Sequence, residues 1–83
     1  MAHNTYSIKF AQSARKHRIG QGHAKYVIAN YEPKVSYLVK ERLKQFEWLG
    51  EDSREIELEI VAKQIGDILL VIHVMPTALR RMK

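Results

Sequence analysis

The sequence predicts an α+β fold in which two N-terminal helices pack on a four-stranded, mainly antiparallel sheet, in the order α-α-β-β-β-β. Two observations lead to this fold class. Residues 55–76 read as two aliphatic strands joined by a tight turn, and residues 7–31 carry apolar positions at helical spacing without a proline. The 83 residues suffice for one small core and little more, so we treat residues 1–83 as a single domain.

The two helices are predicted over residues 7–17 and 21–31, and residues 1–6 are expected to be flexible. Phe10 and Ala14, four residues apart, would share the inner face of the first helix. The second helix has apolar residues at the i, i+3, i+4, i+7 spacing of one buried face, namely Ala24, Val27, Ile28 and Tyr31. The proline that follows ends this helix.

Two strands are predicted over residues 33–39 and 45–49, and the hairpin of residues 55–76 supplies two more. The pair Gly66-Asp67 is typical of a two-residue hairpin turn, because glycine tolerates the positive φ that such turns require. The remaining residues, 77–83, form a basic C-terminal tail that either makes one helical turn or stays extended.

This turn predicts a register in which Ile65 pairs with Ile68, and the register assigns every side chain of the hairpin to a face. The face expected to meet the helices holds Ile56, Leu58, Ile60, Ala62, Leu69, Val71, His73 and Met75. The opposite face holds Glu55, Glu57, Glu59, Val61, Lys63, Leu70, Ile72 and Val74. Because this second face is half aliphatic, we expect it to meet a partner protein through Glu59, Leu70, Ile72 and Val74.

Charge is distributed unevenly along the chain. The net charge is +5, made up of +7 over residues 1–44, −5 over residues 45–76 and +3 over the tail. Such basic segments indicate a polyanionic partner such as RNA, and the alternative is a solvated basic surface. The chain lacks cysteine, which excludes disulfides and thiolate metal sites. No apolar run could span a bilayer and no secretory signal is visible, so we expect a cytoplasmic protein without a membrane partner.

Several short motifs resemble one family. They are Arg15-Lys16-His17-Arg18-Ile19, Trp48-Leu49-Gly50-Glu51-Asp52-Ser53-Arg54, Glu57-Leu58-Glu59-Ile60-Val61-Ala62, Leu70-Val71-Ile72-His73-Val74-Met75-Pro76 and the final Arg80. Together, within residues 13–81, they look like the small toxins of bacterial type II toxin–antitoxin modules, in the BrnT-like branch of the RelE superfamily. The chain departs from that pattern at Glu55, where a glycine is usual, and in the end of its last strand.

The resemblance implies a RelE/BrnT-like fold and a ribonuclease, dependent on the ribosome or not, that a small antitoxin neutralises. RNA cleavage by 2′-OH attack needs a base, an acid and cations near the phosphate. Candidates for the catalytic groups are His17, His23, His73, Glu57 and Arg80. Candidates for RNA binding are Arg15, Lys16, Arg18, Arg54 and Arg81. No metal and no cofactor are expected.

Each of these interpretations has an alternative. His73 is either an acid/base group or a core histidine with a hydrogen-bonded ring, and Glu57 and Glu59 are either functional carboxylates or charges on a solvated face. The partner at the hairpin face is either an antitoxin or a second copy of the chain. The alternative function is a non-catalytic protein-interaction or RNA-binding module that dimerises through this face.

Overall fold

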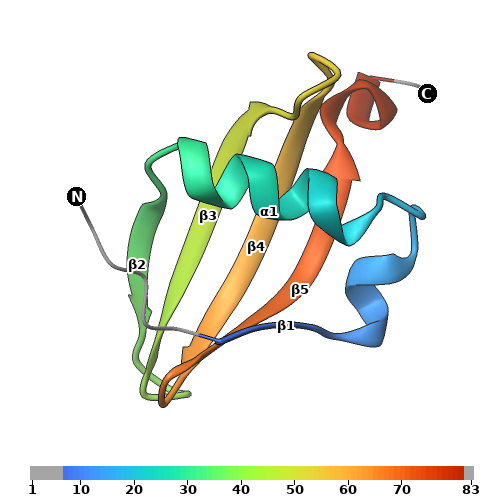
Figure 1. Ribbon diagram of the computed structural model, residues 1–83. Helices are drawn as coiled ribbons and strands as arrows, with labels where there is room; N and C mark the ends of the chain where they lie inside the picture. Colours follow the sequence, from blue (N-terminus) through green and yellow to red (C-terminus); the bar gives the residue numbers. More distant parts are fainter. Residues whose placement is uncertain (1–6, 82–83) are drawn as a thin grey trace.

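Five strands form one mixed sheet, and a single α-helix crosses one of its faces (Figure 1). The computed structural model describes residues 7–81 except the side chain of Arg81, so the expected flexibility of residues 1–6 lies outside the described residues. The elements are β1 (Ser7–Phe10), the 3-10 helix η1 (Gln12–Arg15), α1 (Gln21–Asn30), β2 (Lys34–Leu38), β3 (Leu43–Glu51), β4 (Glu57–Ile65), β5 (Ile68–Pro76) and the 3-10 helix η2 (Thr77–Arg81). The strand order is β1-β5-β4-β3-β2, with β1 parallel to β5 and the other pairs antiparallel.

The protein is thus a small α+β domain with one α-helix and five strands, and the predicted architecture of two helices on a four-stranded, mainly antiparallel sheet is wrong. The error lies in residues 7–17. Ser7, Ile8, Lys9 and Phe10 alternate polar and apolar, and this alternation places Ile8 and Phe10 against the core when the segment pairs with β5. Pairing along the edge of β5 outweighs the helix propensity of the segment, and only Gln12–Arg15 forms a short 3-10 helix.

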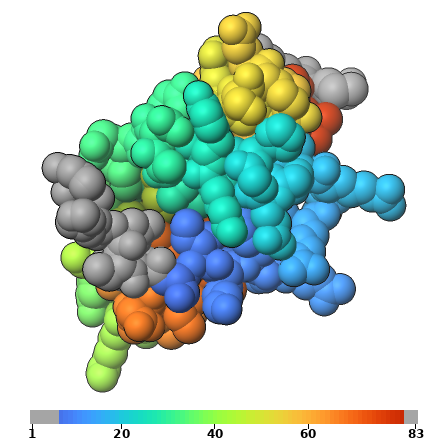
Figure 2. Space-filling view, in the orientation of Figure 1, coloured from blue at the N-terminus to red at the C-terminus, as the bar shows by residue number. Residues whose placement is uncertain are grey.

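The second predicted helix is present as α1, and its buried residues face the sheet. Ala24 and Val27 are fully buried, and they belong to one core cluster with Leu58, Ile60 and Val71 of β4 and β5. Tyr31, just past the helix, lies over Gly50 of β3, where a Cβ atom would come within about 2.5 Å of the tyrosine ring. The space-filling view shows α1 across the front face, bordered by the β3–β4 loop in yellow (Figure 2).

The predicted hairpin is present, and its register is right next to the turn but wrong beyond it. Ile65 pairs with Ile68 and Ala62 with Val71, as expected. A β-bulge then intervenes, because Ile72 has no partner and Val61 pairs with His73. The extra residue turns every later side chain of β5 to the other face.

Three assignments change for this reason, and one of them is Met75, which pairs with Glu59 and so leaves the face expected to meet the helices. Val74, expected at the partner-facing surface, pairs with Ile60 and is 2% exposed in the core, so its assignment to a partner interface is wrong. His73, expected to face the helix beside Ile60, stands instead beside Glu59. The bulge therefore places a histidine on the face of the sheet opposite α1.

No helix in the described part of the chain is long and apolar enough to cross a membrane.

Candidate active site on the open face of the sheet

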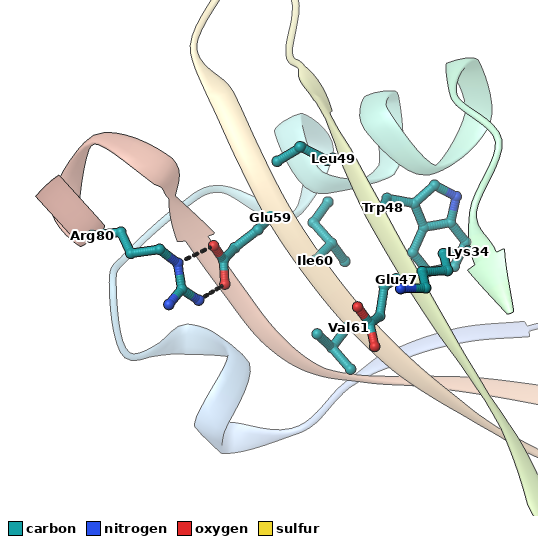
Figure 3. Close-up of a pocket in the computed structure, with 8 residues that line it drawn as sticks. All are labelled: Lys34, Glu47, Trp48, Leu49, Glu59, Ile60, Val61 and Arg80. Carbon is teal, nitrogen blue, oxygen red and sulfur yellow. Dashed lines mark hydrogen bonds and ion pairs between the residues drawn. The ribbon is translucent and has the colours of Figure 1, made fainter. Parts of the chain in front are cut away.

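One face of the sheet carries α1, and among the described residues the other face, here called the open face, carries η2 at one end (Figures 1 and 3). The open face alternates with the core positions of β3, β4 and β5, so it presents Glu47, Leu49, Glu59, Val61 and His73. η2 begins directly after β5 and turns back over this face, where Thr77 Oγ1 donates to a Glu57 carboxylate oxygen at 2.6 Å. The turn brings Arg80 to Glu59, the third residue of β4.

Glu59 joins a histidine and an arginine on this face. Its Oε2 lies 3.0 Å from Nε2 of His73, and its Oε1 accepts a hydrogen bond from Nε of Arg80 at 2.9 Å. A second guanidinium nitrogen of Arg80 also contacts Oε2, so the arginine binds the carboxylate with two groups. Figure 3 shows the Arg80 and Glu59 side chains directed at each other, with α1 behind the strands.

These contacts fix the ionisation of the carboxylate. The hydrogen bonds from Arg80 and His73 favour the charged form, and they hold the pKa of Glu59 below its ordinary value although partial burial opposes them. The same ion pair raises the pKa of Arg80. An ionised carboxylate can only accept hydrogen bonds, so in neutral His73 the proton resides on Nε2 and Nδ1 is left as a free base.

A second histidine approaches from η1. Ser13 of this short helix donates its hydroxyl to the carbonyl of Ile72 at 2.7 Å, and Ala14 is buried against the core, so η1 is held along the edge of β5. His17 follows, and its ring meets that of His73 edge-on, with the ring centroids 6.5 Å apart. The bulge at Ile72 thus positions both histidines. The Ile72 carbonyl accepts a hydrogen bond from Ser13 of η1, and the extra residue turns His73 outward.

Cations occur both in the η1 region and on the open face. Arg15 and Lys16 of the η1 region are exposed and line a hollow of about 510 Å³ together with Phe10 and Gln12. Across the open face a smaller pocket of about 360 Å³ runs from Arg80 and Glu59 past Val61 to Glu47 and Lys34 (Figure 3). The η1 region and the open face therefore each offer positive charge to a polyanion.

The structure separates the remaining candidates from this cluster. His23 lies on α1, on the covered side of the sheet, with Nδ1 3.7 Å from a carboxylate oxygen of Asp52. Arg54 is bound to the same carboxylate at 2.6 Å, and Glu57 is bound to Thr77. Arg18 is exposed with a φ of 58°, and the Arg81 side chain lies outside the described residues. Leu70 and Ile72 are half-buried, and Leu70 pairs with Lys63 of β4.

Sequence reasoning missed two features of the site. It placed Glu59 at a partner surface, whereas Glu59 is the residue that connects His73 with Arg80. It also passed over Asp52, which is 3% exposed and accepts hydrogen bonds from Arg54 and from the backbone N–H of Ile56. A signal for Asp52 was present, because an aspartate two residues before a basic residue in a polar loop is typical of a side chain that binds its own backbone.

Within residues 7–81 no group of three or more potential ligands is arranged to hold a metal ion. Comparisons of the chain with protein-family models, with curated proteins and with solved structures found no match.

Proposed function

We propose that the protein is an endoribonuclease of the toxin type that cleaves RNA by acid/base catalysis without a metal. The observation that carries the proposal is the chain of contacts from Arg80 through Glu59 to His73, with the His17 ring beside it. The arrangement supplies a base, an acid and cations on an accessible sheet face, and these are the groups that phosphodiester transesterification requires.

The roles follow from the contacts. His73, held by Glu59 through Nε2, takes the proton of the ribose 2′-OH on Nδ1. The 2′-oxygen then attacks phosphorus, the bond from phosphorus to the 5′-oxygen breaks, and protonated His17 gives its proton to that leaving oxygen. The products are a 2′,3′-cyclic phosphate and a free 5′-hydroxyl. Arg15, Lys16 and Arg80 supply positive charge for the phosphate oxygens.

Cleavage of a labelled single-stranded oligoribonucleotide tests this proposal. We expect His73→Ala and His17→Ala each to lower the rate by about 100-fold or more, the usual effect of removing a general acid or base. His23→Ala is the matched control, because His23 is also half-buried but contacts Asp52 on the covered side. An oligonucleotide with 2′-deoxyribose should resist cleavage, and cleavage of both polymers would contradict the 2′-OH mechanism.

A partner that covers the open face would also control such an enzyme. Leu49 is 59% exposed and Ile65 is 48% exposed, and both belong to this face. A small antitoxin docked there would bury these side chains and block access to His73. We therefore expect growth arrest on expression of the wild type and none with His73→Ala. If both variants arrest growth equally, the toxicity does not come from this site.

The second candidate function is binding without cleavage, which the same exposed Leu49 and Ile65 favour. If this function is correct, a variant in which His17 and His73 are both replaced still binds its partner. Replacement of Leu49 by lysine abolishes that binding. Intact RNA after prolonged incubation with the wild type would select this function.

A further inference from the structure

Among the described residues the sheet ends at β2, and four of the five residues of this strand are exposed. β2 is the last strand in the order β1-β5-β4-β3-β2, so its outer backbone groups have no strand partner among the described residues. Its apolar side chains are exposed too, with Val35 at 50%, Tyr37 at 58% and the adjacent Val39 at 76%. Free sheet edges bearing apolar side chains are templates for another strand.

We propose that β2 pairs with β2 of a second copy, antiparallel about a two-fold axis at Ser36, so that two sheets join into one of ten strands. In β2 an exposed apolar residue stands on each side of Ser36. The axis places Val35 opposite the partner's Tyr37, and by symmetry Tyr37 opposite the partner's Val35. A β-branched side chain against an aromatic ring is a favourable cross-strand pair.

The charges that flank the strand fit the same register. Two positions before Lys34 stands Glu32, and two positions after Leu38 stands Lys40, and both are exposed. The axis at Ser36 brings the segment of Glu32, just before β2, toward the turn that holds the partner's Lys40, and this encounter occurs twice in the dimer. Opposite charges at such positions favour this register over one shifted by two residues.

The dimer would also change the site. An axis perpendicular to the sheet keeps both α1 helices on one side and both open faces on the other. Lys34, which lines the pocket of Figure 3, pairs with Glu47 of its own β3 and would gain the partner's Leu38 as its neighbour on the outer side. The two pockets would then lie on one continuous surface on either side of the axis.

Disulfide trapping tests this register directly, because the chain has no cysteine of its own among 83 residues. Opposed residues of antiparallel strands have Cα atoms about 4.5 to 5.5 Å apart, within the range that a disulfide spans. Under mild oxidation Ser36→Cys should therefore form a covalent dimer. Lys34→Cys alone should form no covalent dimer. A mixture of Lys34→Cys and Leu38→Cys chains should form the disulfide-linked mixed dimer.

Ser53→Cys, in the exposed β3–β4 loop, measures random collision. The proposal is overturned if Ser36→Cys forms no more dimer than Ser53→Cys, or if Lys34→Cys alone forms dimers as readily as the mixture. The first result would mean that the edge has another occupant, and the second that the strands pair in another register.

Sedimentation equilibrium gives a second test that involves no cysteine. Tyr37→Lys removes both symmetric pairs and should weaken association about tenfold. Glu32→Lys should weaken it as well, and adding Lys40→Glu should restore it by reversing the pair. Equal association of these three variants and the wild type would overturn the proposal, as would a wild type that is monomeric at all concentrations.

Discussion

Asp52 is a single residue that organises the β3–β4 loop. Its carboxylate binds the guanidinium of Arg54 and the backbone N–H groups of Arg54 and Ile56, and it lies near His23 of α1. Burial would raise the pKa of Asp52, but the hydrogen bonds from Arg54 and from the backbone outweigh this and lower it. The ionised carboxylate therefore stabilises the folded state.

Acid unfolding of the wild type and of Asp52→Asn tests this. Because the pKa of Asp52 is lower in the folded than in the unfolded chain, its stabilisation is complete above the unfolded value of about 3.9 and is lost as pH falls through the folded value. We expect Asp52→Asn to lower the free energy of unfolding by about 2 kcal/mol at pH 7. The difference should shrink as pH falls below the unfolded value, and a constant difference would contradict the assignment.

Glu55 occupies a backbone conformation that suits glycine. Its φ is 65°, in the left-handed region, and its side chain is exposed. Glu55→Gly should raise the free energy of unfolding by about 0.5 kcal/mol, since the strain relieved exceeds the entropy that glycine adds to the unfolded chain. Glu51→Gly, in strand β3, is the control and should lower it. Chemical denaturation measures both, and a loss of stability in Glu55→Gly would argue against strain at this position.

Gly50 is required for a different reason. Its Cβ would approach the ring of Tyr31 to about 2.5 Å, whereas a Cβ at Gly22 of α1 would meet nothing within 4 Å. We expect Gly50→Ala to lower the free energy of unfolding by about 2 kcal/mol through overpacking. Gly22→Ala should leave it unchanged or raise it. Thermal unfolding separates the two. In a Tyr31→Ala background the cost of Gly50→Ala should largely disappear, and a cost that persists would show that the ring is not its cause.

Among the elements, β5 shows how far sequence patterns could predict the structure. Its hairpin turn and the pairing from Ile65 and Ile68 to Ala62 and Val71 follow from the Gly-Asp pair and the strand period. The bulge at Ile72 could not be predicted, because the run of aliphatic residues around it is compatible with either face. That single extra residue decides the position of His73, so the candidate site could not be assembled from the sequence.

Deletion variants test the bulge. Removing Ile72 should leave a regular strand in which Val71 and Val74 stay buried and His73 stays beside Glu59. The free energy of unfolding should fall by about 1 kcal/mol, because the contact with Ser13 is lost. Removing Leu70 should expose Leu69 or shift the turn. The free energy of unfolding should then fall by about 3 kcal/mol or more. Denaturant unfolding compares the two deletions. Equal costs would mean that Ile72 is not the extra residue.

The prediction of a helix over residues 7–17 was wrong for a related reason. Residues 7–10 satisfy a helical pattern and a strand pattern equally, and four residues are too few for either period to prevail. The strand conformation of this segment is decided by β5. The outer edge of β5 is available for parallel pairing, although it lies 61 positions further along the chain. Helix α1, by contrast, was predictable because its apolar stripe from Ala24 to Tyr31 spans about two turns and Pro33 follows it.

At the scale of the whole molecule, the basic charge lies mainly in segments that precede β3, and the acidic charge in β3, β4 and their loop. The site sits where these regions meet, with Glu59 between Arg80 and the cations of the η1 region. The charge asymmetry was visible in the sequence, but the specific encounter of His17 with His73 depends on β1, which the sequence did not reveal.

The pairing of β1 with β5 also constrains the order in which the molecule can be made. Ser7 is synthesised early and Ile68 late, yet the two are partners in the sheet. A nascent chain cannot dock β1 and η1 until β5 has been translated, and such distant pairing slows folding. His17 therefore has no His73 beside it on an unfinished chain. If the protein cleaves RNA, the messenger that encodes it is protected from each growing copy until β5 has been translated.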